Sequence, residues 1–216
     1  MMQKLVEAFM RFFFKHLYTT FARAYDFVAW TTSMGQWRNW QSEALIEFPP
    51  GILLEIGHGP GHLLLDIKRL GNNEIFGVDP SRQMTRLASE RFRKVGEPNV
   101  SIRAKAQSLP FPSGSFSGVI ATFPSEYILD SKTLEAVIRA IQSGGKFVLI
   151  GLGSITGRTF YDRFAGWLYR TTGQSGYAES AYEPWLKELE RLGFEAHIES
   201  IDQPRARVVR ILAGKP

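Results

Sequence analysis

"LLEIGHGPGHLLLDI", residues 53–67, is the stretch that decides the fold. A short apolar run breaks on Gly57, Gly59 and Gly61, and a leucine-rich helical pattern follows at once. Spaced glycines between a strand and a helix bring the main chain close to a ligand, because glycine has no Cβ and adopts positive φ freely. The free N–H groups at the start of the helix favour an anionic ligand group. The stretch therefore predicts a ligand-binding turn between a buried strand and a helix.

Strand and helix patterns alternate along the chain beyond this turn. Such alternation predicts a parallel, doubly wound sheet with helices on both faces. The last two strand patterns indicate a β-hairpin, which would place antiparallel strands at one sheet edge. We therefore expect an α/β fold with a mostly parallel seven-stranded sheet. The expected strands span 51–57, 73–79, 99–106, 116–123, 146–153, 194–201 and 206–214, and the expected helices span 61–71, 81–96, 130–145 and 184–193.

The N-terminal segment differs from the rest of the chain in charge and aromatic content. Residues 1–41 hold five basic and two acidic residues, so they carry +3 of the net charge of +5. The pattern over 3–30 predicts one helix with a narrow polar stripe and a wide aromatic face. We expect residues 1–45 to form a helical cap or lid on a domain spanning 46–216, which carries a helical insertion at 154–180. The N-terminal helix would either pack on its own domain or make peripheral contact with an anionic membrane surface.

Composition excludes several kinds of site. The 216 residues include no cysteine, which removes disulfides, thiolate metal sites and cysteine nucleophiles. Four histidines, at 16, 58, 62 and 197, match no metal-ligand spacing, so no metal is expected. Basic residues interrupt the N-terminal apolar pattern before it reaches the ~20 residues of a membrane span, and no signal-peptide cleavage site follows it. We expect a cytoplasmic protein whose membrane contact is limited to the N-terminal helix, while its oligomeric state stays open.

The glycine spacing narrows the choice among nucleotides, dinucleotides and S-adenosylmethionine (SAM), which are all held by such turns. Gly57-x-Gly59-x-Gly61 is not the Gly-x-Gly-x-x-Gly of dinucleotide folds, and the chain has no Gly-Lys-Ser/Thr phosphate loop. Asp79 ends the second expected strand, 18 residues after Gly61. A carboxylate at that strand end can accept hydrogen bonds from both hydroxyls of a ribose. The turn therefore favours a ligand with an unphosphorylated ribose.

Four sequence blocks in order point to one family. "LLEIGHGPG", "GVDPSRQM", "AQSLPFPSGSFSGVI" and "IQSGGKFVLI" together resemble the class I SAM-dependent methyltransferases, which have a Rossmann-like fold. The nearest subgroup is that of the quinone and small-molecule methyltransferases, whose entry segment is similar to "FARAYDFVAWTTSMGQWRNW". The resemblance covers about residues 21–152 well, and the C-terminal third by architecture only. Four blocks at the right strand ends are far more specific than a lone glycine loop.

The resemblance implies a set of residues that would bind SAM. The three glycines would let the main chain approach the methionine moiety, with a tyrosine closing over it and an acid near its amine. A second acid would bind the ribose, and a methionine, an alanine and a glutamine would lie at the adenine. A phenylalanine would end the fourth strand under the cofactor, and a histidine would shape the loop. In chain order these residues are Tyr25, Glu55, Gly57, His58, Gly59, Gly61, Asp79, Met84, Ala106, Gln107 and Phe123.

The chain departs from the family pattern at two positions. Lys105 stands before Ala106, where an acid or amide usually accepts from the adenine amino group, and lysine can only donate. Gln107 could supply the acceptor instead. Ser117 stands after Phe116 where an acid is common, a change that affects local packing more than chemistry.

Catalytic groups are harder to assign than cofactor groups. Glu126 and Tyr127 follow the fourth strand, where either could orient or deprotonate a substrate, and Tyr127 could equally be wall packing. His58 could act in acid–base chemistry, but shaping the loop is the favoured role. Methyl transfer from a sulfonium mainly needs alignment and exclusion of water, so the lack of a triad does not argue against an enzyme.

The sequence therefore predicts a SAM-dependent methyltransferase acting on a small, apolar or lipid-like acceptor. The alternative is a non-catalytic SAM-binding or membrane-associated module. A nucleic-acid partner is disfavoured, because the chain lacks an Asn/Asp-Pro-Pro-aromatic motif after the fourth strand and its basic residues do not gather around the expected site.

Overall fold

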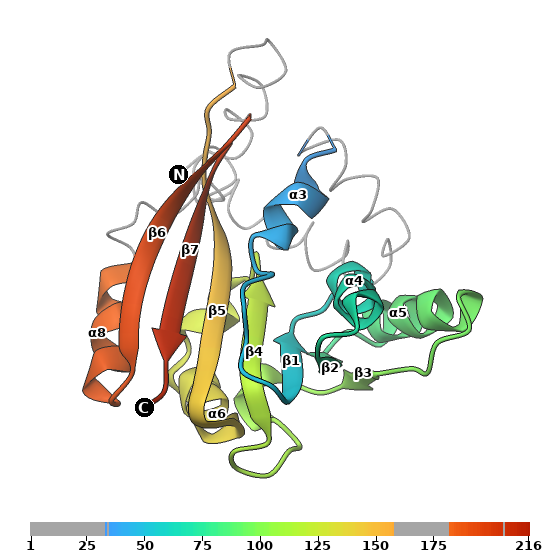
Figure 1. Ribbon diagram of the computed structural model, residues 1–216, viewed down its shortest axis with the longest axis horizontal. Coiled ribbons are helices and arrows are strands. Elements are labelled where there is room, and N and C mark those ends of the chain that lie inside the picture. Colours follow the sequence, from blue (N-terminus) through green and yellow to red (C-terminus); the bar gives the residue numbers. More distant parts are fainter. Residues whose placement is uncertain (1–32, 34, 158–181, 205) are drawn as a thin grey trace, which may run out of the picture.

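The computed structural model describes residues 33, 35–157, 182–204 and 206–216, which build one seven-stranded sheet (Figure 1). The strand order is β3-β2-β1-β4-β5-β7-β6. Strands β1 to β5 pair in parallel, and β7 runs antiparallel to both of its neighbours. The mostly parallel α/β sheet and the edge hairpin are confirmed. The strands are β1 Ile52–Ile56, β2 Glu74–Asp79, β3 Ser101–Arg103, β4 Phe116–Thr122, β5 Ile141–Ile155, β6 Glu195–Gln203 and β7 Ala206–Gly214.

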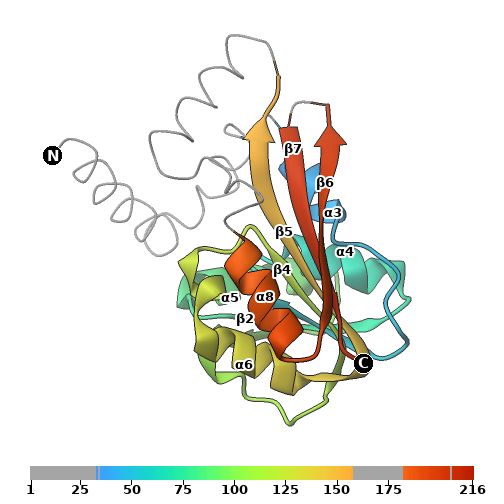
Figure 2. The ribbon, with the colours of Figure 1, turned by 90° about the vertical axis from the view of Figure 1, so that its left-hand side faces the viewer.

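Helices cover both faces of this sheet. In Figure 2, α6 and α8 lie on one side and α3 and α4 on the other. Local capping explains two helix starts: the Asp130 carboxylate accepts from the Lys132 amide at 3.0 Å, and the Ser81 hydroxyl accepts from the Met84 amide at 3.3 Å. The helices are α3 Trp37–Ser42, α4 His62–Leu70, α5 Arg82–Lys94, α6 Ser131–Ala140 and α8 Glu183–Arg191, with 3₁₀ turns η2 Ala106–Ser108 and η3 Glu126–Leu129.

Three element boundaries differ by three residues or more from the sequence-based expectation. The third strand was expected to span 99–106 but ends at Arg103, because the chain then turns into η2. The helix expected over 130–145 ends at Ala140, and β5 begins at Ile141, which pairs with Phe116 ahead of a register shift. The buried, β-branched Ile141 fits a strand better than a helix end. The expected helix at 3–30 and most of the 154–180 insertion lie outside the described residues.

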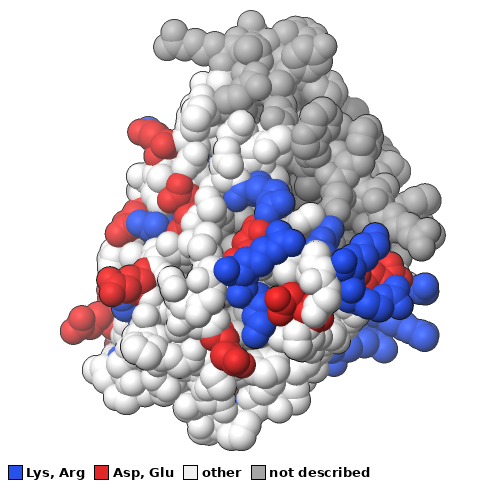
Figure 3. Space-filling model, turned by 45° about the vertical axis from the view of Figure 1, so that its right-hand side comes forward, with Lys and Arg blue, Asp and Glu red and all other residues white. Residues whose placement is uncertain are grey.

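Charged side chains on the face toward the viewer in Figure 3 are of mixed sign. Among the described residues, Arg38 contacts Asp66 at 2.6 Å and Arg86 contacts Glu90 at 2.9 Å.

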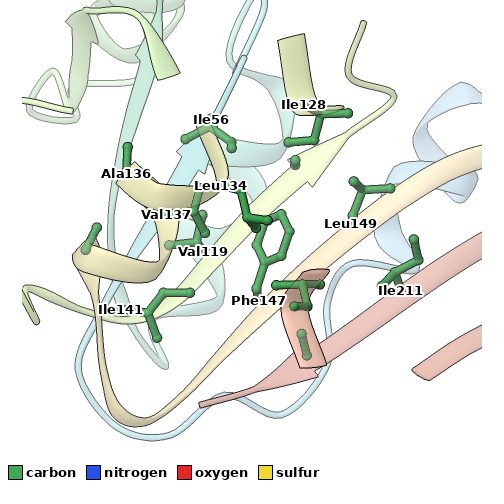
Figure 4. Packing of buried hydrophobic residues seen from close by; sticks show 14 of the residues in the cluster. Ile56, Val119, Ile128, Leu134, Ala136, Val137, Ile141, Phe147, Leu149 and Ile211 are labelled. Carbon is green, nitrogen blue, oxygen red and sulfur yellow. The ribbon is translucent and has the colours of Figure 1, made fainter. Parts of the chain in front are cut away.

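Two apolar clusters, one on each face, hold the sheet in place. The first packs α6 and α8 against the strands around the fully buried Phe147, whose ring lies 5.5 Å from that of Trp185 (Figure 4). Burying a side chain of this size stabilises the fold by about 2–3 kcal/mol. The second cluster packs Trp40 and Ala44 against α4 and the opposite sheet face. The clusters together fix β1, β2 and β4 side by side, so their carboxyl ends meet at one edge.

Candidate functional site

The turn after β1 adopts a backbone that needs its glycines. Gly57, Gly59 and Gly61 have φ of +73°, +53° and +78°, in the left-handed region that other residues avoid. A Cβ on Gly57 would lie 2.3 Å from the Tyr127 hydroxyl, and one on Gly61 would lie 2.8 Å from Cβ of Ala88. A Cβ on Gly59 would meet no atom of the described residues within 4 Å. Gly57 and Gly61 thus permit close packing, whereas Gly59 leaves its side of the turn open.

Asp79 ends β2 beside this turn and binds main chain with both carboxylate oxygens. Oδ2 accepts from the amide of Gly59 at 3.0 Å, and Oδ1 accepts from the amide of Ser81 at 2.8 Å. The side chain is 7% exposed, and this burial raises the pKa of Asp79 to about 6 despite the two amides. A carboxylate has about four lone-pair sites. Two acceptor positions of Asp79 are therefore left for a ligand.

His58 lies beneath the turn as a buried, neutral ring. Nδ1 is 2.7 Å from the carbonyl oxygen of Gly59, and Nε2 is 2.9 Å from the hydroxyl of Ser101 on β3. Because a carbonyl only accepts, Nδ1 carries the proton, and Nε2 of the neutral ring accepts from Ser101. Burial lowers the pKa of His58 to about 4. The ring is thus built into the protein and is unsuited to proton transfer near neutral pH.

Glu55 on β1 is the most deeply buried acid of this edge. It is 1% exposed, and its Oε2 has no hydrogen-bond partner among the described residues. Burial, and after it the nearby carboxyl of Asp79, raise the pKa of Glu55 well above its ordinary value, although a hydrogen bond with the Leu64 backbone opposes this. Neither acid forms an ion pair with a lysine or arginine within the described ranges. The edge therefore gathers buried acidic groups that lack a cation.

The residues expected at an adenine fall into two groups. Ala106 and Gln107 lie in η2, where the Gln107 Nε2 donates to Oδ2 of Asp130 at 3.2 Å. This contact orients Oε1 of Gln107 as the free acceptor, while the side chain of Lys105 is exposed. Met84, in contrast, is fully buried on the inner face of α5. Its predicted packing on adenine stays a prediction.

The end of β4 carries a backbone outlier. Phe123, just after the strand, has φ of +47°, unlike any other non-glycine residue in the described ranges. Its ring lies 4.3 Å from that of Trp37 and 6.3 Å from that of Trp40, both on α3. Such strain costs about 1–3 kcal/mol and persists where the surroundings enforce it, often at functional sites. Next to it, Gln41 donates to the Thr122 hydroxyl at 3.2 Å, so α3 is tied to this strand end.

The residues proposed for catalysis are only partly described. The Tyr127 hydroxyl donates to the carbonyl of Ile56 at 3.3 Å, which places this side chain against the glycine turn. Glu126 begins η3, but its side chain lies outside what the structure describes, as does the whole of Tyr25. A substrate contact for Glu126 or Tyr127 stays a prediction.

Sequence reasoning missed two residues of this site. Ser101 contacts His58 from 43 positions away in the chain. Trp37, which precedes β1 in the chain, packs on Phe123, which follows β4. The only signal for Ser101 was a polar residue at a buried position of a short strand. No local pattern pairs Trp37 with Phe123, because their contact depends on where α3 docks.

The described residues were also searched for metal sites and membrane spans. They contain no group of three or more His, Cys, Asp or Glu side chains that could hold a metal ion. In the same ranges, no helix combines the length and the apolar character needed to cross a bilayer.

Comparisons with known proteins show which proteins this chain resembles. Residues 53–145, which run from β1 into β5, match the family model described as "Methyltransferase domain". A demethylmenaquinone methyltransferase from Symbiobacterium thermophilum is 30% identical over 146 residues, which cover 63% of this chain and 57% of that protein. A ubiquinone/menaquinone biosynthesis C-methyltransferase from Geotalea daltonii is 27% identical over 145 residues, covering 63% and 61%. The chain thus matches less than two thirds of these relatives' lengths.

Solved structures share the same fold at low sequence identity. The YcgJ protein from Bacillus subtilis superposes with a TM-score of 0.60 at 18% identity, over 82% of this chain and 97% of that one. A geranyl diphosphate C-methyltransferase from Streptomyces coelicolor gives a TM-score of 0.62 at 14% identity, over 82% and 78%. The glycine turn, the acid that ends β2 and the matched domain lead to one assignment. Residues 53–145 match a methyltransferase domain, and the sheet has the fold of the class I SAM-dependent methyltransferases, whose cofactor is SAM.

Proposed function

We propose that this protein transfers a methyl group from SAM to a small, apolar or lipid-like acceptor. The observation that carries the proposal is the pair formed by Asp79 and Gly59. Asp79 keeps two acceptor positions beside Gly59, where a Cβ would meet no atom of the part of the chain that the structure describes within 4 Å. Two acceptors on one carboxylate match the two hydroxyls of a ribose.

The charges of the site fit this cofactor as well. SAM carries a positive sulfonium, and Glu55 and Asp79 are buried acids without a basic partner among the described residues. A bound cation nearby would favour their ionised forms and offset part of the cost of burying them. His58 is neutral, so it adds no positive charge that would repel the cofactor.

The chain's own residues would bind and orient the reactants. Bound SAM supplies a methyl group activated by its sulfonium. Asp79 would hold the ribose, the main chain of Gly57 and Gly59 would approach the methionine end, and Oε1 of Gln107 would accept at the adenine edge. The Tyr127 side chain, which covers the turn, would help to exclude water from it. Positioning and exclusion of water are the main requirements of such a displacement.

The nature of the acceptor is argued from relatives and from local aromatic residues. Both relatives described above are named for methylation in quinone biosynthesis. Trp37 and Phe123, each only partly buried, pack together at the end of β4, which adjoins the proposed cofactor site. Flat aromatic surfaces suit an aromatic acceptor. We therefore propose that the methyl acceptor is a reduced quinone or a similar lipid-like phenol. The protein would be cytoplasmic and would reach this acceptor through peripheral contact with a membrane.

Calorimetric titration tests the cofactor. Wild-type protein is expected to bind SAM and S-adenosylhomocysteine, and not NAD. Asp202→Asn on β6 serves as a control, because it changes an exposed acid of the hairpin and should leave SAM binding unchanged. If NAD bound and SAM did not, the proposal would be wrong.

Turnover separates an enzyme from a non-catalytic SAM-binding module. We expect release of S-adenosylhomocysteine when SAM is supplied with a chemically reduced naphthoquinone or a total lipid extract. Binding of SAM without release in either mixture would favour the non-catalytic alternative.

A further inference from the structure

His58 and Ser101 form a buried connection between β3 and the glycine turn. The Ser101 hydroxyl donates to Nε2 of His58 at 2.9 Å, and Nδ1 of the same ring donates to the carbonyl of Gly59 at 2.7 Å. Both residues are almost fully buried, with exposed fractions of 7% for Ser101 and 3% for His58. Because both are largely shielded from water, each hydrogen bond orients its partner strongly.

The main chain around Gly59 is fixed on both sides by this arrangement. Its amide donates to Asp79 at 3.0 Å, while its carbonyl accepts from His58. The following residue is Pro60, so the peptide group between them has no N–H, and its carbonyl is the only polar group that can be held. The hydrogen bond from the imidazole to this carbonyl is therefore the interaction that orients the peptide group.

The sheet provides a slot for the imidazole. Gly77 on β2 lies beneath it, and a Cβ there would be 2.9 Å from Cδ2 of His58 and 2.5 Å from Cδ1 of Leu64. A buried ring with a dedicated slot and two hydrogen bonds is held in one orientation.

We propose that Ser101 and His58 are positioning residues for SAM, which set the orientation of the Gly59 peptide beside the ribose-binding acid. The inference rests on the proposed function and adds two residues to it. Ser101 and His58 act through Gly59 and need not touch the cofactor. The connection requires the Nδ1–H form of the neutral ring, because the opposite tautomer would point a lone pair at the Gly59 carbonyl.

The test compares two buried serines. Ser101→Ala removes the hydroxyl that holds His58. The control is Ser117→Ala on β4, where a fully buried hydroxyl donates to the Ile52 carbonyl at 3.2 Å, at the start of β1 and away from the turn. Both variants lose one buried hydrogen bond, and both should lower the melting temperature similarly. Only Ser101→Ala is expected to weaken SAM binding, by about fivefold, the effect of one neutral hydrogen bond.

Two further measurements separate positioning from simple loss of stability. Ser101→Thr keeps the hydroxyl and should restore SAM affinity close to the wild-type value. Nitrogen-15 NMR of the imidazoles, which needs no ligand, should show His58 as the neutral Nδ1–H tautomer, and Ser101→Ala should shift its Nε2 signal.

The outcomes are distinguishable. Equal SAM affinities for Ser101→Ala and Ser117→Ala, or an Nε2–H tautomer at His58, would overturn the inference and leave the proposed function standing. Failure of the wild-type protein to bind SAM would overturn the proposed function, and the positioning role with it.

Discussion

Acidic residues on the β6–β7 hairpin and acidic residues on β1 and β2 lie in opposite environments. On the β6–β7 hairpin, Glu199 and Asp202 contact Arg210 and Arg207, and hydrogen bonds from these arginines lower the pKa of both carboxyl groups. At the carboxyl ends of β1 and β2, burial raises the pKa of Glu55 and of Asp79. The hairpin acids are paired with arginines, whereas the two buried acids have no cationic partner among the described residues.

This difference identifies which acids serve the fold and which serve a ligand. An exposed, paired acid contributes a small amount to stability. A buried acid without a cation lowers the stability of the free protein, so its presence needs another reason. Binding of a cationic cofactor with ribose hydroxyls supplies that reason for Glu55 and Asp79.

The largest expected effect comes from removing the ribose-binding acid. Asp79→Ala removes the two proposed hydrogen bonds that the ribose hydroxyls donate to this carboxylate. Each contributes about 1.5 kcal/mol or more, so the dissociation constant for SAM should rise about 100-fold or more. Titration calorimetry measures this change. Asp202→Ala on the hairpin is the matched control, and equal SAM affinities in the two variants would remove the distinction between the two kinds of acid.

Packing beneath the turn should be less tolerant than packing on the hairpin. Gly77→Ala would force a Cβ into Leu64 and into the ring of His58, which two hydrogen bonds hold in place. We expect a loss of about 1–3 kcal/mol in the free energy of unfolding. Gly214→Ala on β7, where a Cβ meets nothing within 4 Å, should change it by less than about 0.5 kcal/mol. Denaturant unfolding of both variants gives the answer, and similar losses in the two would contradict a tight slot at Gly77.

SAM affinity should depend on pH through Asp79. Its pKa in the free protein is about 6, and ribose hydroxyls favour the ionised form, so binding is strongest above pH 6 and weakens as pH falls through that value. Between pH 7 and pH 5 we expect about a tenfold loss of affinity, the change for one coupled proton. Asp79→Asn should bind weakly at every pH with a flat profile, while Glu55→Gln should keep the step near pH 6. A flat wild-type profile would exclude this coupling.

The smallest expected effects concern how stability depends on pH, and they should have opposite signs for Glu55 and Glu199. Glu55 has a raised pKa, so the native state retains a proton that the unfolded chain releases, and its contribution to stability falls as pH rises. Glu55→Gln should therefore gain stability relative to wild type with rising pH. Glu199 has a lowered pKa, so its contribution is present at neutral pH and is lost in acid.

Glu199→Gln should cost less than about 1 kcal/mol at neutral pH, because the ion pair is partly exposed. Thermal unfolding between pH 4 and pH 9 compares the two variants. The same sign of pH dependence for both would show that the two regions do not differ in the way described.

Several parts of the fold and site were predictable because their signals are local. The strand, glycine turn and helix of residues 53–67 lie within one short segment, and Asp79 ends the next strand. Alternating strands and helices indicated the parallel sheet, and the final two strand patterns indicated its antiparallel edge. The boundary errors lie near Arg103, where the chain turns into η2, and near Ile141, whose β-branched side chain fits a strand better than a helix end.

Other parts depend on contacts between distant segments. The strand order β3-β2-β1 brings Ser101 under the turn that His58 occupies, and no pattern around either residue announces the partner. Docking of α3 likewise brings Trp37 onto Phe123, whose backbone strain is invisible in the sequence.

The sequence by itself determined the resemblance to methyltransferases, the glycine turn and the acid that ends β2, because these depend on residue types at fixed short spacings. The tertiary structure alone decided that His58 is a neutral, doubly hydrogen-bonded ring, that Met84 is buried and that Gln107 presents its oxygen. Burial and hydrogen-bond partners are properties of neighbours in space, and the packing of the sheet sets those neighbours.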